Sequence, residues 1–160
     1  HYIGSQVDVP ATIANFPYLL VAGQAEEGED AYVVRTPFFY IKETGAIACD
    51  APLPEGSTIR IGRCTREAIL EAATHAAESI HRELDGRRPA ALLVFSCSGR
   101  KQQLGFQVNE EFNNIRSVLG DEVPVLGFFS YGELGPITGP MGESESHYHG
   151  YTVSMLALAA

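Results

Sequence analysis

AALLVFSCSGR at residues 90–100 and VPVLGFFSYGE at residues 123–133 are the two stretches that decide the fold. Each is a nearly continuous apolar run that ends in small and reactive residues. An apolar run without period-2 alternation is typical of a strand buried on both faces, as in a parallel sheet. A helix-like segment lies between the two runs, so together they predict a βαβ unit with a right-handed crossover. Ligands of open α/β sheets bind outside the carboxyl ends of the strands, where these reactive residues would gather.

The rest of the chain predicts antiparallel N-terminal strands, a helix and C-terminal strands around this unit. Short strands are expected at residues 18–22, 31–35, 38–42, 46–49 and 57–62, with a hairpin turn at residues 43–45. One helix should begin after an N-cap at Thr65 and end at Gly86, and a second should run from Gln107 to Leu119. Residues 143–158 suit strands. The predicted fold class is α/β with a mixed sheet.

Length and the first residue bear on the domain organisation. A chain of 160 residues fits one domain, residues 1–160. It begins with His1 instead of Met, so we expect a piece of a longer polypeptide. No apolar stretch approaches the roughly 18 to 20 residues of a membrane-spanning helix, and no signal peptide is visible. These patterns predict a protein without a membrane partner.

Charge and cysteine content narrow the function classes. The net charge is −9, from 20 acidic and 11 basic residues, which argues against nucleic acid as a partner because such binding needs clustered Lys and Arg. The three cysteines, Cys49, Cys64 and Cys97, are odd in number and form no CxxC pair. They indicate reduced thiols and a cytoplasmic location.

The segment at residues 96–105 carries the first candidate site. It lacks the Lys-Ser/Thr that a P-loop needs after its second glycine, and it has no dinucleotide fingerprint. Arg100 offers a planar fork that suits a ligand carboxylate. The alternative is a plain loop, and the sequence leaves both open.

The second candidate lies at residues 128–136, where glycines and a proline impose special backbone geometry. Tyr131 would supply an aromatic wall and Glu133 an anionic acceptor, so that Glu133 meets an ammonium group and Arg100 a carboxylate. A turn that satisfies only its own neighbours is the alternative. The expected ligand-binding residues of the two segments are Cys97, Ser98, Arg100, Ser130, Tyr131 and Glu133.

Two further patterns point to other chemistries. Cys97 near Arg100 suggests a thiol of lowered pKa and hence a nucleophile, although a buried apolar role is commoner for a single cysteine. His147 and His149 share one face of a strand with Glu143 and Glu145, an arrangement suited to a metal ion or a haem iron. A solvated strand end is the alternative, and we expect neither a catalytic residue nor a bound cofactor.

Several stretches together resemble the C-terminal domain of the FIST family. The resemblance rests on residues 91–100 (ALLVFSCSGR), Leu104-Gly105, Glu111, residues 125–136 (VLGFFSYGELGP) and residues 147–152 (HYHGYT). Residues 32–35 (YVVR) and 55–57 (EGS) fit the first half of the same domain. The resemblance covers most of the chain. One departure is the His149-Gly150 pair, near which many members have Asn.

This resemblance implies a ligand-sensing module of prokaryotic and some eukaryotic signalling proteins. The implied partners are an N-terminal FIST domain and a signalling output protein or domain. The ligands proposed for the family are small molecules, amino acids among them, and some members resemble haem-based nitric oxide sensors. We therefore expect a non-enzymatic sensory domain for a small polar ligand. The alternatives are a haem or metal sensor through His147 and His149, a Cys97-dependent enzyme, and a structural half of a two-domain sensor.

Overall fold

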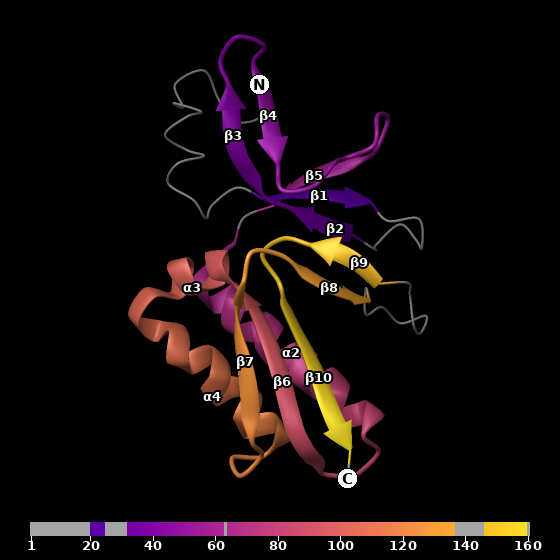
Figure 1. Ribbon diagram of the computed structural model, residues 1–160, viewed down its shortest axis with the longest axis vertical. Helices are drawn as coiled ribbons and strands as arrows, with labels where there is room; N and C mark the ends of the chain where they lie inside the picture. Colours follow the sequence, from indigo (N-terminus) through magenta and orange to yellow (C-terminus); the bar gives the residue numbers. More distant parts are fainter. Residues whose placement is uncertain (1–19, 25–31, 63, 137–145, 160) are drawn as a thin grey trace. The chain divides into compact units, whose positions relative to one another are not determined.

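The computed structural model of the protein describes residues 20–24, 32–62, 64–136 and 146–159 (Figure 1). The contacts along the chain divide it into two compact units. Unit 1 comprises His1–Cys64 and Leu134–Gly150, and unit 2 comprises Thr65–Glu133 and Tyr151–Ala160. The chain passes between the units three times, after residues 64, 133 and 150.

The N-terminal strands of unit 1 pair antiparallel, as the sequence predicts. Its three-stranded sheet has the order β2-β1-β5, and a hairpin (β3 and β4) and a strand pair (β8 and β9) complete its described part. The strands are β1 (Leu20–Gln24), β2 (Tyr32–Arg35), β3 (Pro37–Ile41), β4 (Ala46–Cys49), β5 (Ile59–Gly62), β8 (Glu133–Pro136) and β9 (Ser146–His149). Gly45 closes the hairpin turn with a φ of 71°, a left-handed conformation that glycine adopts without strain.

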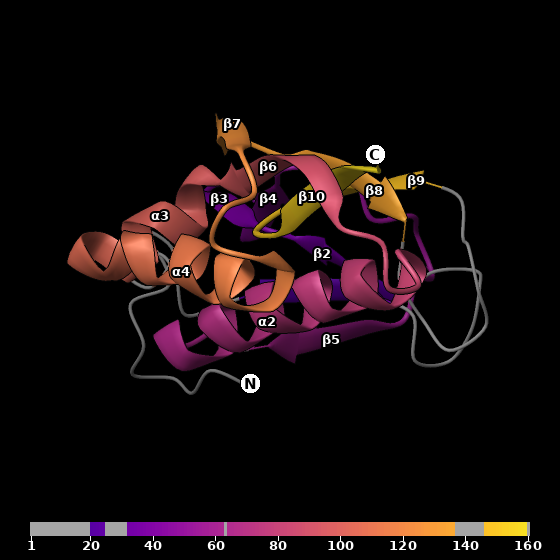
Figure 2. The same ribbon diagram turned by 90° about the horizontal axis from the view of Figure 1, so that it is seen from below.

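Unit 2 contains the predicted βαβ unit. Its sheet has the order β10-β6-β7, in which β6 (Pro89–Cys97) pairs parallel with β7 (Val125–Ser130) and antiparallel with β10 (Val153–Ala159). The helices α2 (Arg66–Glu83) and α4 (Val108–Leu119) lie on the same face of this sheet (Figure 2). The mixed α/β fold is therefore confirmed.

The start of α2 and the hydrophobic core follow from the sequence. The side chain of Thr65 accepts a hydrogen bond from the backbone N–H of Ala68, the N-cap contact that the sequence predicts. Small alanines let α2 approach the sheet closely. The core contains seven buried residues from α2, β6 and α4 and the ends of these helices, namely Ala73, Ala77, Leu84, Leu92, Val94, Ile115 and Leu119.

Three local expectations are wrong. The segment after β6 is not a loop, because residues 98–104 form helix α3 (Ser98–Leu104) and residues 105–107 a 3₁₀ turn. Residues 133–136 form strand β8, so the turn that was one of the two alternatives for residues 128–136 is wrong there. The strands of unit 2 are also not buried on both faces, since Leu126 is 73% exposed and Phe128 is 66% exposed. Helices α2 and α4 cover one face of the described sheet, and these two side chains belong to the other.

Candidate functional site

The carboxyl ends of β6 and β7 bring several of the predicted site residues together in unit 2. Cys97 ends β6 and is in register with Ser130 at the end of β7. The backbone N–H of Cys97 also donates to the carbonyl of Thr152, just before β10 (2.9 Å). The parallel register therefore places a thiol and a hydroxyl on neighbouring strand ends.

Glu133 is the carboxylate of this cluster, and it is only 3% exposed. Its Oε1 accepts a hydrogen bond from Ser130 Oγ (2.7 Å), and its Oε2 accepts from Thr152 Oγ1 (2.9 Å) and from the Thr152 backbone N–H (3.3 Å). Burial raises the pKa of Glu133, while these hydrogen bonds and the charge of Arg100 act in the opposite direction. The site thus holds a carboxyl group that takes up a proton more readily than an exposed glutamate.

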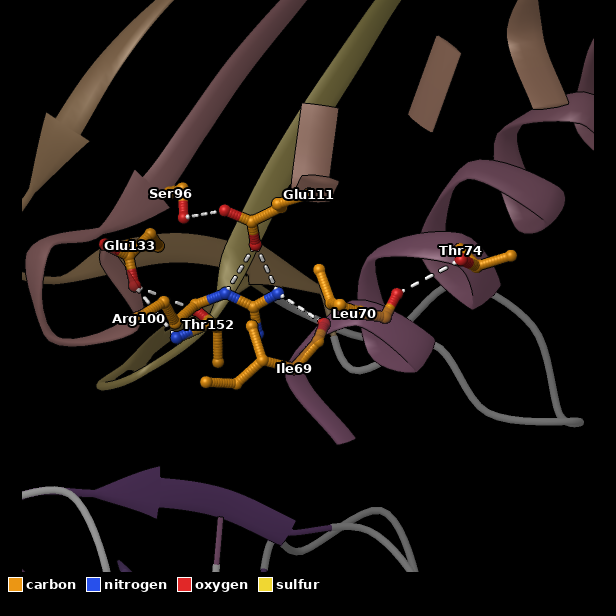
Figure 3. Close-up of polar contacts among 8 residues, drawn as sticks. All are labelled: Ile69, Leu70, Thr74, Ser96, Arg100, Glu111, Glu133 and Thr152. Carbon is orange, nitrogen blue, oxygen red and sulfur yellow. Dashed lines mark hydrogen bonds and ion pairs between the residues drawn. The ribbon is translucent and has the colours of Figure 1, made fainter. Parts of the chain in front are cut away.

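Arg100 forms a buried ion pair with Glu111 (Figure 3). Its Nε donates to Glu111 Oε1 (2.8 Å), and its Nη2 donates to the same oxygen and to the carbonyl of Ile69 (3.0 Å). Ser96 Oγ donates to the other carboxylate oxygen of Glu111 (2.9 Å). Arg100 is 4% exposed and Glu111 is fully buried, so this guanidinium is already matched by a carboxylate of the protein itself.

Glu111 is a residue of the site that reasoning from the sequence missed. It lies on α4 one turn before Ile115, so it shares the buried face of that helix. A carboxylate inside an apolar stripe needs a charged or hydrogen-bonding partner. That need was the available signal, and Arg100 is the partner.

Cys97 does not fit an activated nucleophile. Burial raises the pKa of its thiol, and the nearby Glu133 raises it further. Backbone hydrogen bonds from Gly99, Tyr151 and Arg100 only partly oppose this effect. The lowered pKa expected from the neighbouring Arg100 is therefore wrong, because burial has the largest effect on the pKa of this thiol and the Glu133 charge adds to it.

The remaining predicted ligand contacts lie nearer to solvent. Tyr131 follows β7 and is 83% exposed, and Ser98 at the start of α3 is half-buried. Ser130 is half-buried as well. Of the predicted ligand-binding residues, Tyr131 is therefore exposed and Ser98 and Ser130 are half-buried, while the remaining three, Cys97, Arg100 and Glu133, are buried.

The histidines lie in unit 1, on β9. His149 is buried, and its Nε2 lies 3.1 Å from the carbonyl of Gly135, a hydrogen bond in which the ring N–H donates. Burial lowers the pKa of His149 most, the Gly135 hydrogen bond raises it, and His147 and Arg35 lower it. The described residues contain no group of three or more side chains that could hold a metal ion, and Glu143 and Glu145 lie outside them. A haem or metal site here stays a prediction.

The closing stretch HYHGYT makes structural contacts within each unit. In unit 1, Arg35 Nη1 donates to the carbonyl of Tyr148 (2.7 Å), and the N–H of Gly150 donates to the carbonyl of Val34 (3.0 Å). In unit 2, the Tyr151 hydroxyl donates to Gln103 Oε1 (3.3 Å). The first two contacts use backbone atoms of the stretch and do not depend on its residue types, whereas the third requires the Tyr151 hydroxyl.

The comparisons with known proteins agree with this architecture. A family model for the FIST C domain matches residues 1–136. An uncharacterized protein of Mycobacterium bovis is 30% identical over 131 residues, which are 82% of this chain and 32% of that protein. Two uncharacterized proteins of Mycobacterium tuberculosis match over the same length with 30% and 29% identity. The chain thus spans about a third of the length of these curated relatives.

No solved structure matches the chain. None of the described helices has both the length and the apolar character that crossing a membrane requires.

Proposed function

Because the chain belongs to the FIST C domain family, a family of sensory domains in signal transduction, we propose that it senses a small polar ligand without catalysing a reaction. The ligand class that the site favours is a primary amine or an amino acid. Its positive group would bind at the carboxyl ends of β6 and β7. The proposed partners are an N-terminal FIST domain and a signalling output protein or domain, in the cytoplasm.

The observation that carries this proposal is the buried carboxyl group of Glu133, which lies in hydrogen-bond contact with the half-buried Ser130 at the end of β7. Among the described residues, the donors to Glu133 are neutral: the hydroxyl groups of Ser130 and Thr152 and the backbone N–H of Thr152. Oε2 already accepts two of these hydrogen bonds and Oε1 one, so Oε1 can accept a further bond, and an ammonium group would supply a charged donor for it. Ser98, Ser130 and Tyr131 would contact the rest of the ligand.

Arg100 has a different proposed role from the one that its sequence context suggests. Its fork is directed at Glu111, so it would position the site and leave the ligand to other residues. Its charge favours the ionised form of Glu133, which is the form that attracts a cation. Cys97 would line the base of the site as a neutral thiol.

A thermal-shift and calorimetric screen with the amino acids and small primary amines tests the proposal. A ligand at a hundred times its Kd should stabilise the protein by about 2.7 kcal/mol. Glu133→Gln should abolish the shift, whereas Glu78→Gln, at an exposed glutamate on α2, should leave it unchanged. The screen should be repeated on a longer polypeptide that includes the N-terminal FIST domain. If no amine stabilises either protein, or if Glu133→Gln binds as well as the parent, the proposal is wrong.

A further inference from the structure

A groove runs along the outer edge of β7 in unit 2, between this strand and α4. It has a volume of about 620 Å³. Its lining includes Val125, Gly127 and Phe129 of β7 and one face of α4, which contributes Asn109, Phe112, Asn113 and Arg116. The rings of Phe112 and Phe129 meet edge to face with centroids 6.0 Å apart. The groove is separate from the cluster around Glu133.

The backbone of β7 shows which of its residues face this groove. The N–H of Leu92 on β6 donates to the carbonyl of Pro124, so the even-numbered residues of β7 direct their N–H and C=O groups toward β6. Val125, Gly127 and Phe129 then direct theirs outward, because the backbone alternates along a strand. In the described sheet β7 is one of the two edge strands, the other being β10 (Figure 1). An edge of this kind accepts another strand.

We infer that β7 pairs antiparallel with β7 of a second copy of this chain, so that two three-stranded sheets join into one. A two-fold axis at Gly127 places it opposite its own counterpart and places Val125 opposite Phe129 of the partner. All three outward-facing residues are then paired. Leu126 and Phe128, exposed on the open face, become cross-strand apolar neighbours. A two-fold interface requires this kind of self-complementary surface.

The charges beside the groove favour a second copy over an unrelated strand. Phe112 packs on Phe129, so the first half of α4 lies near the end of β7 and Arg116 lies toward its start. Glu110 borders the groove through a hydrogen bond from Asn113 Nδ2 (3.4 Å). In the antiparallel pair, Arg116 of one copy faces Glu110 of the other, twice in each dimer. The dimer thus pairs opposite charges on each side of its axis.

Light scattering and sedimentation of the 160-residue chain test this inference. The parent should reach twice its 17.3 kDa monomer mass in a concentration-dependent manner. Arg116→Glu and Glu110→Lys should each weaken dimerisation about tenfold, since each places like charges together twice. The double variant Arg116→Glu/Glu110→Lys should restore it. Lys42→Glu, an exposed residue of unit 1, is the matched control and should change nothing.

A second variant tests the strand pairing itself. Val125→Pro removes an N–H that points away from β6, so the sheet of the monomer keeps its hydrogen bonds while the partner loses one. Val125→Pro should give a monomer whose far-ultraviolet circular dichroism spectrum is the same as that of the parent. A parent that is monomeric at every concentration overturns the inference. So does a dimer that survives Val125→Pro, or one that the double charge exchange does not restore.

Discussion

Removing one partner of the Arg100–Glu111 ion pair should destabilise unit 2 far more than removing both. Arg100→Met leaves the buried Glu111 carboxylate with Ser96 as its remaining donor among the contacts described above, and Glu111→Leu leaves a buried guanidinium with the carbonyl of Ile69. An uncompensated buried charge of this kind costs about 3–5 kcal/mol. A domain of this size has a total stability of about 5–15 kcal/mol, so either variant should lose a large part of it.

The double variant Arg100→Met/Glu111→Leu should recover most of this loss. Replacing a buried ion pair by apolar side chains of similar volume is often neutral or stabilising by about 1–4 kcal/mol. Against this gain, the buried hydroxyl of Ser96 loses its acceptor, which costs about 1–3 kcal/mol. We therefore expect the double variant to lie within about 2 kcal/mol of the parent. Adding Ser96→Ala should raise its stability by about 1 kcal/mol or more.

Urea unfolding followed by circular dichroism at the helical wavelength measures these effects. The described helices α2, α3 and α4 all belong to unit 2, so this signal reports on the unit that holds the ion pair. The free energies come from linear extrapolation, with the slope checked for each variant. A double-mutant cycle then gives the coupling between the two residues. Additive single effects, or single effects below about 1 kcal/mol, would refute the reasoning.

Four further predictions concern the buried polar groups and one glycine. Burial raises the pKa of Glu133, so the stability that this group contributes is present at acidic pH and is lost as the pH rises through the raised pKa. The melting temperature of Glu133→Gln relative to that of the parent should therefore increase from acidic to neutral pH. A difference that stays constant with pH would contradict this. Burial lowers the pKa of His149, so the stability that the neutral imidazole contributes is lost as the pH falls through the lowered pKa. The free energy of unfolding of His149→Asn should therefore decrease less than that of the parent between about pH 7 and pH 5. Iodoacetamide should label Cys97 more slowly than it labels glutathione at neutral pH, because burial raises the pKa of this thiol. Peptide mapping with a Cys97→Ser control measures the labelling. Faster labelling of Cys97 would restore the nucleophile hypothesis. Gly99→Ala should lower the free energy of unfolding by about 1–3 kcal/mol, because a Cβ at this position would lie 2.6 Å from the ring of Tyr151. The effect should outweigh the helix propensity of alanine, which a Ser98→Ala control measures separately. A Gly99→Ala variant more stable than the parent would show that the ring of Tyr151 can move.

The elements of the fold that the sequence predicts correctly are those with a long and regular pattern. The apolar runs at β6 and β7 are continuous enough to indicate strands, and the long alanine-rich stripe of α2 has enough residues to define a helical period. Helix α3 has only seven residues and begins with Ser98 and Gly99, which are typical of turns. Its buried residues Arg100, Gln103 and Leu104 follow helical spacing, but two of them are polar, so no apolar stripe reveals it.

The open face of the unit 2 sheet shows a different limit of sequence patterns. Leu126 and Phe128 read as core residues because a pattern reports how apolar a strand is and says nothing of what covers it. The helices α2 and α4 account for only one face (Figure 2). Covering the other requires a layer that the apolar run itself does not identify.

The candidate site was predictable in position but not in the partners of its charges. Topology alone places Cys97 and Ser130 on neighbouring strand ends, and the parallel register confirms it. Which carboxylate would neutralise Arg100 depends on how α4 packs against β6, a long-range contact without a local signal. The extent of the domain, residues 1–160, stays a prediction.

The pairing of Arg100 with Glu111 decides which part of an amino acid the cluster would recognise. A ligand carboxylate would have to compete with Glu111 for a guanidinium that is 4% exposed, and the displaced Glu111 would remain buried without its cation. A ligand ammonium would displace no charged hydrogen-bond donor of the described residues, because those that donate to Glu133 are neutral and Arg100 acts on it through its charge alone. It would also offset the burial that raises the pKa of Glu133, since a nearby cation favours the ionised carboxylate. The positive group of a ligand is therefore the part that this arrangement of charges favours, and a simple amine should bind in preference to a simple carboxylate.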